Sequence, residues 1–420
     1  VTYAQQALDL LPEGDHLWRR AATSLLGVAQ YTSGDLQAAH QSLTDLMIDM
    51  QETSNIPDAI SLAFLLADIR ITLGRLHEAA TVYQQALQLA ERQGEPVGTS
   101  DLHRGLSELY CEWGDLLTST QHLQRGEELG EQASLTDWPH RLAVTRARLK
   151  EARGDLEGTV DLLNEAERHY VKNPLPKVRP TAALRARVWA KQGRLAEALA
   201  WAGEKGLSAD DELHYLSEFE HITLARILIS AYRNNRQEHT IQDAKQLLAR
   251  LLDAAKAGGR MGSAIEILIL QALAPEAQND ITGALIPLER ALILAEPQGY
   301  VQTFITEGPP MSRLLHETLS DNIVPEYTRK LLAAIPPTEL GKTKTTSEIR
   351  NPTSDILDPL SQRELEVLRL LATELSGPEI ARELMISLNT LRTHTKNIYS
   401  KLGVNNRRSA VRRAQELNLL

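Results

Sequence analysis

Small and apolar residues recur with a fixed period along the chain as far as residue 298. In five segments a glycine is followed by a polar residue and a leucine, and the spacing between these glycines is nearly constant. They are Gly34, Gly74, Gly114, Gly154 and Gly193. Two weaker copies follow, near Asn235 and at Asn279. A fixed period of about 40 residues is typical of stacked helix pairs.

The positions around each turn residue predict how the two helices of a pair meet. Small residues stand seven positions before it and five positions after it in six copies, which lets antiparallel helices approach closely. The earlier set is Gly27, Ala67, Ser107, Ala147, Ala186 and Ala272, and the later set is Ala39, Ala79, Ser119, Thr159, Ala198 and Ala284. Glycine or asparagine suits the turn because both tolerate left-handed backbone. Nine positions after it, larger residues are predicted to pack against the next pair: Leu43, Tyr83, Leu123, Leu163 and Leu288.

The pattern predicts an all-α fold with a helical-repeat superhelix over residues 1–298. The best copy, "GRLHEAATVYQQAL", resembles the second helix of a tetratricopeptide repeat. A hydrophobic content of 42% with only 4% aromatic residues also favours helices over strands. The first residues, "YAQQALDL", resemble the stretch after Tyr83, so we expect a truncated first repeat in a chain that is part of a longer protein. An Ala-rich bundle without repeats is the alternative, and the sixfold spacing argues against it.

The repeat period ends after residue 298. Residues 299–335 contain two proline-led apolar stretches, which predict two closing helices. Residues 336–357 are polar and rich in Thr, Ser and Pro, which predicts a flexible linker. Gly-Lys-Thr at 341–343 matches only the end of a phosphate-binding loop, and Pro336 stands where that loop needs a glycine, so no nucleotide site is predicted.

The charge pattern reverses near the C-terminus. The whole chain carries a formal charge of −10, but seven Arg and Lys residues oppose one Glu from Ser387 onward, a local balance of +6. Four helices are predicted in residues 358–420, and Ser361, Ser376 and Ser387 are predicted to cap the first three. The second and third are short and closely joined, which predicts a helix-turn-helix at about 377–396.

A helical wheel separates two faces of the third of these helices. Leu391, Thr395, Ile398 and Leu402 fall on the side predicted to face the core. Asn389, Arg392, Thr393 and Lys396 fall on the opposite side. In a major groove, Arg can bind guanine bidentately, Asn suits adenine and a Thr methyl group can contact thymine. The outward face is therefore predicted to read DNA bases.

The segment from Leu360 to Leu420 resembles the DNA-binding domain of LuxR-type transcription regulators. The resemblance is carried by the opening Leu-Ser-x-Arg-Glu, by Glu379-Ile380-Ala381, by Asn389-Thr390 and by Lys401-Leu402. It implies base contacts from Arg392, Thr393 and Lys396 with Asn389 beside them, DNA-backbone contacts from Thr390, His394, Lys401 and Arg407, and dimerisation through the last helix with Ala410, Val411 and Ala414. Arg392 stands where the family usually has Lys, so its base preference cannot be transferred.

Helical repeats followed by a LuxR-type end resemble MalT-like regulators. That resemblance implies an activator that binds a duplex DNA operator as a homodimer or larger assembly, contacts RNA polymerase and senses a small-molecule inducer or a regulatory protein with its repeats. It also implies a signalling ATPase module upstream of these residues. The inducer, its binding residues, the operator and the regulated genes are not specified by the sequence.

Several other classes of function find no support in the sequence. The lone Cys111 cannot form an internal disulfide, which favours a buried thiol and a cytoplasmic setting. No membrane span, metal-ligand spacing, catalytic constellation or cofactor site is predicted. Five tryptophans could line a ligand site but are predicted to pack in the core: Trp18, Trp113, Trp138, Trp189 and Trp201. The alternatives left open are a tetratricopeptide interaction scaffold with no DNA role and a regulatory fragment of a signalling ATPase.

Overall fold

The chain folds into two compact units, Val1–Thr343 and Lys344–Leu420, in the computed structural model. The boundary falls inside 336–357, the predicted linker, which lies outside the described residues. All regular elements in the described residues are helical, so the all-α prediction is confirmed. The structure describes residues 1–52, 56–94, 97–135, 137–171, 178–335, 362–373, 375–384, 391, 395, 398, 399, 404 and 407–416.

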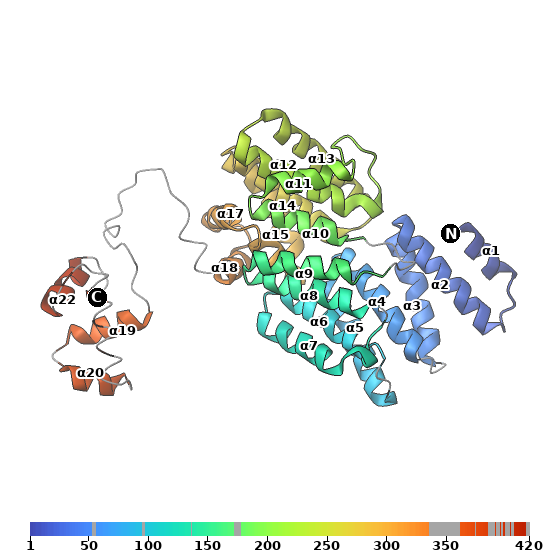
Figure 1. The fold of residues 1–420 in the computed structure, drawn as a ribbon, viewed down its shortest axis with the longest axis horizontal. Helices are drawn as coiled ribbons and strands as arrows, with labels where there is room; N and C mark the ends of the chain where they lie inside the picture. The colour runs from blue at the N-terminus through green and yellow to red at the C-terminus, as the bar shows by residue number, and fades with distance from the viewer. Residues whose placement is uncertain are drawn as a thin grey trace. The chain divides into compact units, whose positions relative to one another are not determined.

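Antiparallel helix pairs follow one another through the first unit (Figure 1), after the short helix α1 (Thr2–Leu10). In chain order the helices are α2 (His16–Ser33), α3 (Leu36–Glu52), α4 (Ile56–Thr72), α5 (Leu76–Gln93), α6 (Thr99–Glu112), α7 (Leu116–Leu129), α8 (Trp138–Ala152), α9 (Leu156–Arg168), α10 (Thr181–Lys191), α11 (Leu195–Glu204), α12 (Glu218–Asn235), α13 (Glu238–Ala257), α14 (Met261–Ala277) and α15 (Ile281–Ala295). The short α16 (Gln302–Ile305) precedes α17 (Pro309–Ser320) and α18 (Pro325–Ala334), which occupy the two proline-led stretches. Single 3₁₀ turns lie at η1 (Glu131–Ala133), η2 (Tyr215–Ser217) and η3 (Glu296–Gln298).

The turns form for the reasons that the sequence suggested. All five repeat glycines adopt left-handed backbone, with φ between +77° and +86°. The residue after the glycine adds a cap that the sequence analysis missed. Asp115 accepts a hydrogen bond from the Thr118 amide, and Asp155 accepts one from the Gly158 amide. The aspartate that follows several repeat glycines therefore starts the second helix while the glycine ends the first.

The small residues on either side of each turn are buried between the paired helices, as predicted. A methyl group built on Gly27 would lie 2.3 Å from Leu43 Cδ2, so a larger residue there would displace the Leu43 side chain. Where the small residue is polar, it bonds across the pair. Ser119 Oγ donates to the Ser107 carbonyl at 2.8 Å.

Two late turns differ from the prediction. Near Asn235 the left-handed residue is Arg236, with φ +56°, and the Asn235 side chain instead accepts a hydrogen bond from the Gln237 amide. Asn279 does adopt the left-handed conformation, with φ +64°. A further left-handed glycine, Gly259, joins α13 to α14 and was not predicted.

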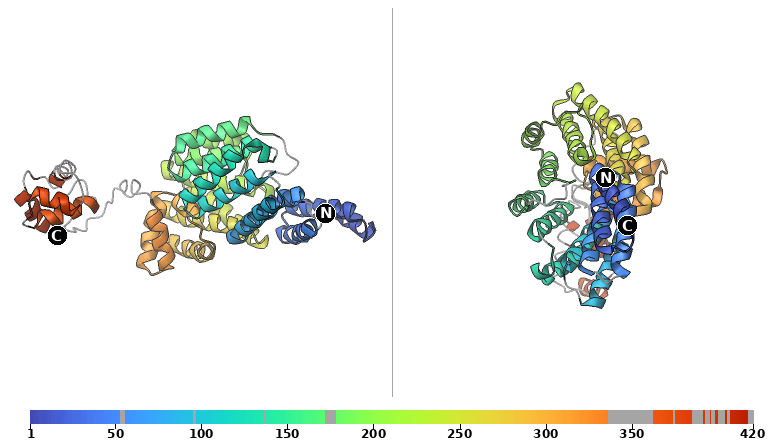
Figure 2. Two further views of the ribbon diagram at one scale, coloured as in Figure 1. Left: turned by 90° about the horizontal axis from the view of Figure 1, so that it is seen from below. Right: turned by 90° about the vertical axis from the view of Figure 1, so that its right-hand side faces the viewer.

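The repeats wind into a superhelix whose successive turns touch. Methyl groups built on Gly34, Gly74 and Gly114 would lie 3.0, 2.9 and 3.0 Å from side-chain atoms of Tyr215, Met261 and Val301 respectively. Each partner lies several repeats further along the chain than its glycine. In the right-hand view of Figure 2 the later helices, yellow and orange, return beside the blue ones. The repeat glycines of the early pairs are therefore also contact points between superhelical turns.

In the described part of the second unit, nine buried residues form a core. Its described helices are α19 (Gln362–Leu371), α20 (Gly377–Glu383) and α22 (Arg407–Glu416). Ser376 caps α20 as predicted, and Glu379 completes a capping box by accepting from the Ser376 amide at 2.8 Å. Ser361 and Ser387, the other predicted caps, lie outside the described residues.

Candidate functional site

The predicted DNA-reading residues lie mostly outside the described part of the second unit. Their helix is described at Leu391, Thr395, Ile398 and Tyr399. Leu391 and Ile398 are buried in the unit's core, as the helical wheel predicted, and Thr395 Oγ1 donates to the Leu391 carbonyl at 2.8 Å. The residues outside the described set are Asn389, Thr390, Arg392, Thr393, His394, Lys396 and Lys401. Their roles stay predictions.

Arg407 has a structural role that sequence reasoning missed. Its Nε donates to the Leu371 carbonyl at 2.8 Å, and its two terminal nitrogens donate to the carbonyls of Leu375 and Thr373, each at 2.7 Å. These carbonyls lie at and just after the end of α19, where carbonyl groups have no partner within the helix. Arg407 therefore fastens α22 to the turn before α20, and a contact with the DNA backbone stays a prediction.

Residues predicted for dimerisation lie in the core of the second unit, and dimerisation through α22 stays a prediction. Ala410 and Ala414 are fully buried in the core of the second unit itself, so their side chains offer no surface to another chain. Val411 is half-buried and packs against the same core. The three residues follow the apolar stripe of α22, and that stripe faces inward. A dimer through α22 would have to use its other face.

An inner cavity of about 320 Å³ lies within the first unit. It is lined by residues of α4, α5, α6, α8, α9, α10, α12 and α14 and by the segment 300–307, which we call its cover. A second cavity of about 520 Å³ adjoins it and shares lining residues such as Lys191, Gln302 and Glu307. The ionisable residues around the inner cavity are Asp68, Glu108, Cys111, Glu112, Arg148, Glu151, Arg179, Arg187, Lys191, Arg226, Glu266, Tyr300 and Glu307.

Most of the charged groups at the inner cavity form ion pairs. Glu266 Oε1 accepts from Arg187 at 2.6 Å and from Arg226 at 2.9 Å, and Arg226 also pairs with Glu307. Burial raises the pKa of Glu266, but the two arginines outweigh burial and lower that pKa to about 2. Lys191 pairs with Glu151 at 2.7 Å. The pairs of Glu266 and Glu307 connect α10, α12, α14 and the loop after α16, and the Lys191–Glu151 pair connects α10 to α8.

Residues 298–303 connect the cover of the inner cavity to the early repeats. The Val301 amide donates to the Glu112 carbonyl at 2.9 Å, and Thr303 donates to Glu112 Oε1 from both its amide and its hydroxyl, at 2.9 and 2.7 Å. Trp113 Nε1 donates to the Gln298 carbonyl at 2.9 Å. Burial raises the pKa of Glu112, and Arg148 and Thr303 only partly offset it.

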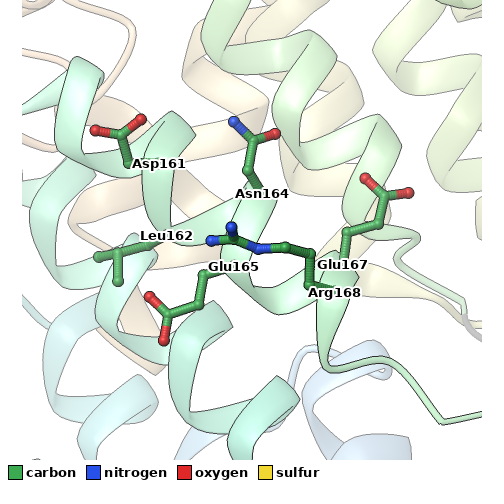
Figure 3. A pocket seen from close by; sticks show the side chains of 6 residues that line it. All are labelled: Asp161, Leu162, Asn164, Glu165, Glu167 and Arg168. Carbon is green, nitrogen blue, oxygen red and sulfur yellow. The ribbon is translucent and has the colours of Figure 1, made fainter.

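Other candidate residues have ordinary surroundings. In the described part of the chain, none of the five tryptophans lines the inner cavity. Trp138 and Trp201 are buried as predicted, but Trp18 is 61% exposed, so the prediction of core packing is wrong for it. Cys111 is buried as predicted, and burial raises the pKa of its thiol to about 12. A surface hollow along α9 is lined by six residues of that one helix, whose side chains point in different directions (Figure 3). It holds no convergent set of polar groups.

The described residues contain neither a metal-binding cluster nor a membrane-spanning helix. No group of three or more His, Cys, Asp or Glu residues in them is arranged to hold a metal ion. No helix among them has the length and apolar character needed to cross a bilayer.

Comparison with known proteins relates both units to bacterial regulators. The family model of the MalT-like TPR region matches residues 1–321, and that of the bacterial regulatory proteins of the luxR family matches residues 358–414. Over 99% of its length the chain is 27% identical to the HTH-type transcriptional regulator MalT of Cronobacter sakazakii and 28% identical to the protein of that name from Yersinia enterocolitica. The chain spans 47% of the length of each relative.

Proposed function

Because the chain belongs to the family with a MalT-like TPR region and carries a luxR-family domain, we propose that it is a DNA-binding transcription regulator. The observation that carries the proposal is the luxR-family match over 358–414, in which the core positions Leu391 and Ile398 are buried. A helix with these two residues inward turns Arg392, Thr393 and Lys396 outward, because successive residues are about 100° apart. This arrangement supports major-groove binding by the third helix of the second unit.

Base recognition in this proposal belongs to Arg392, Thr393 and Lys396, with Asn389 beside them. Thr390, His394 and Lys401 hold the DNA backbone. The protein binds paired half-sites as a dimer or larger assembly, because a single helix-turn-helix module buries little surface. It acts as an activator through contact with RNA polymerase.

The repeat unit is the proposed sensor, and the inner cavity is the proposed place for its effector. The cavity lies between two superhelical turns, so a ligand there touches helices from both. If the superhelical turns can adopt two spacings, such a ligand favours one of them only when it makes better contacts in that spacing than in the other. Effector binding in the inner cavity thus changes the arrangement of the repeats, and with it the surface that a partner protein or a second copy of the chain would bind.

Replacing Arg392 and Lys401 by alanine tests the DNA-reading proposal. We select a preferred duplex from a random pool with the full chain and measure affinities for it and for random duplex. Arg392→Ala should cost about 1–3 kcal/mol on the selected duplex and much less on random DNA. Lys401→Ala should weaken binding to both duplexes similarly. If Arg392→Ala weakens both equally while Lys401→Ala changes sequence preference, the proposed placement of the helix is wrong.

A further inference from the structure

Most charges around the inner cavity cancel within the protein. Arg187, Arg226, Glu266 and Glu307 form a group with equal numbers of positive and negative charges, and Lys191 with Glu151 forms a second. Apart from Arg226 Nε, which has no hydrogen-bond partner among the described residues, these groups bind one another and offer little to a ligand. The polar groups of the inner cavity that lie outside these ion pairs are therefore the main candidates for binding a ligand.

Two arginines remain after this pairing. Among the described residues Arg179 has neither an ion pair nor a hydrogen bond, and its guanidinium carbon lies 5.7 Å from the centre of the Phe219 ring. Arg148 lies 3.6 Å from Glu108 Oε2 and donates no hydrogen bond in the described part of the chain. Arg104 and the Thr145 hydroxyl bind the other oxygen, Glu108 Oε1, at 2.7 and 2.5 Å, so Arg148 has only the longer contact with Oε2. Arg148 and Arg179 thus keep donors for another acceptor.

A second carboxyl group near these arginines, that of Glu112, competes only weakly for them. Arg148 and Arg179 both lie close enough to Glu112 to lower its pKa, yet burial prevails and the pKa of Glu112 is raised. Its Oε1 already accepts two hydrogen bonds from Thr303. Glu112 is therefore occupied by the cover of the cavity rather than by the arginines.

Two buried polar groups without partners also line the inner cavity. Tyr300 is 5% exposed and Gln302 is 7% exposed. Neither the Tyr300 hydroxyl nor Gln302 Oε1 has a hydrogen-bond partner within the described residues. Leaving such a group unsatisfied costs about 1–3 kcal/mol, so a ligand that satisfies both gains free energy that no contact within the protein supplies.

We propose that the inner cavity binds a small molecule through an anionic group, a carboxylate or a phosphate, held by Arg148 and Arg179. This inference rests on the proposed function of the repeat unit as a sensor, and it specifies the chemical class of the effector. Arginine suits the anion because its planar fork matches the oxygens of either group. Tyr300 donates a further hydrogen bond, and Gln302 Oε1 accepts one from a hydroxyl or amide group elsewhere on the ligand. A volume of about 320 Å³ limits the ligand to a small metabolite.

The experiment compares three probes that differ in charge but share a hydroxyl group. Glycerol 3-phosphate carries a phosphate, malate carries carboxylates, and glycerol is neutral. We titrate each into the full chain by calorimetry at constant ionic strength and record the melting temperature at saturation. We expect saturable binding of glycerol 3-phosphate or malate with one site per chain, and no binding of glycerol at the same concentrations. The anionic probe that binds identifies phosphate or carboxylate as the preferred group.

Variants assign the binding to the two arginines. Arg148→Gln and Arg179→Gln should each raise the dissociation constant of the bound probe at least tenfold. Arg168→Gln, on the exposed face of α9 (Figure 3), should leave it unchanged. Arg148→Lys keeps the charge without the fork and should retain part of the affinity. Melting curves recorded without probe identify any variant that fails to fold. If Arg148→Gln fails to fold, Arg148→Lys is used in its place.

Three results would overturn the proposed ligand class. They are the absence of saturable binding by both anionic probes, equal affinity of glycerol, and unchanged binding in the double variant of Arg148 and Arg179. DNA binding by the full chain is measured in parallel. If it persists while any of these results is obtained, the anionic class fails and the proposed regulator remains. If DNA binding is absent, the proposed function fails whatever the probes do.

Discussion

The two units of this protein use charge in opposite ways. From Lys344 onward, twelve Lys and Arg residues oppose nine Asp and Glu, which gives a formal charge of +3. Because the whole chain carries −10, positions 1–343 carry −13. In the acidic repeat unit, buried arginines are held by glutamates between helices far apart in the sequence. In the small basic unit, the described contacts of Arg407 go to main-chain carbonyls instead. Arginine thus joins superhelical elements in one unit and fastens a helix end in the other.

Core size explains much of this difference. The second unit spans only Lys344–Leu420, and so small a unit buries a small fraction of its surface, so caps and side-chain-to-backbone bonds have a large share in its stability. The repeat unit buries apolar side chains along nearly its whole length and can also accommodate a charged interior. Substitutions of single charged residues should therefore have different consequences in the two units.

The largest expected effect is in the repeat unit. Glu266→Ala leaves Arg187 and Arg226 facing each other with only Glu307 to pair with them. Removing one member of a buried ion network costs about 3–5 kcal/mol, and we expect a corresponding drop in the free energy of unfolding. Denaturant unfolding of the full chain, followed by circular dichroism, measures it. Glu326→Ala, which removes an exposed pair with Arg329, is the matched control and should change little.

The same network predicts a dependence of stability on pH. The pKa of Glu266 is about 2 in the folded protein and 4.5 in the unfolded chain, so its contribution to stability is complete above about pH 4.5. It should decrease as the pH falls from 4.5 towards 2. In Glu266→Ala this part of the decrease should be missing. Equal acid sensitivity of both proteins would contradict the assigned pairing.

Contact between superhelical turns is tested by two glycines with the same backbone. Gly74 and Gly154 both have φ +79°, but only Gly74 faces the next turn, where a methyl group would lie 2.9 Å from Met261 Cβ. Alanine costs about 1–2 kcal/mol in left-handed backbone at either position. Gly74→Ala should cost about 1–3 kcal/mol more because it also overpacks the contact. Equal losses in thermal stability for the two variants would show that the turns do not touch in solution.

A smaller loss is expected from Arg407→Ala in the second unit. It removes three hydrogen bonds to the end of α19 and should destabilise that unit by about 1–3 kcal/mol. Hydrogen exchange of amides in α19 and α22 measures the loss locally. Arg369→Ala, an exposed arginine on α19, removes the same charge without these bonds and should leave exchange unchanged. If both variants exchange alike, Arg407 does not fasten the helix.

Local patterns in the sequence predicted much of this structure. The small residues around each turn and the inward face at Leu391 and Ile398 follow from helical periodicity, and both were found buried. The stripe at Ala410 and Ala414 was also detectable, but periodicity cannot tell a core from an interface, and both residues were found buried within the unit itself. The contacts of Gly74 with Met261 and of Glu266 with Arg226 join residues with no local relation in the sequence. The inner cavity arises from those distant contacts, which explains why no pattern in the sequence predicted its residues.

DNA binding at several salt concentrations tests the proposed regulator most directly. The affinity for a random duplex is measured for three full-length proteins: the unmodified chain, Lys401→Ala and Lys256→Ala. Lys256→Ala is the control, because it removes an exposed lysine of α13 in the repeat unit. The logarithm of the association constant should fall linearly with the logarithm of salt concentration, because bound lysines and arginines displace counterions from phosphates. Lys401→Ala should lower the slope by about one ion, and Lys256→Ala should not change it. A flat salt dependence, or equal slopes for Lys401→Ala and the unmodified protein, would contradict DNA binding by the basic unit.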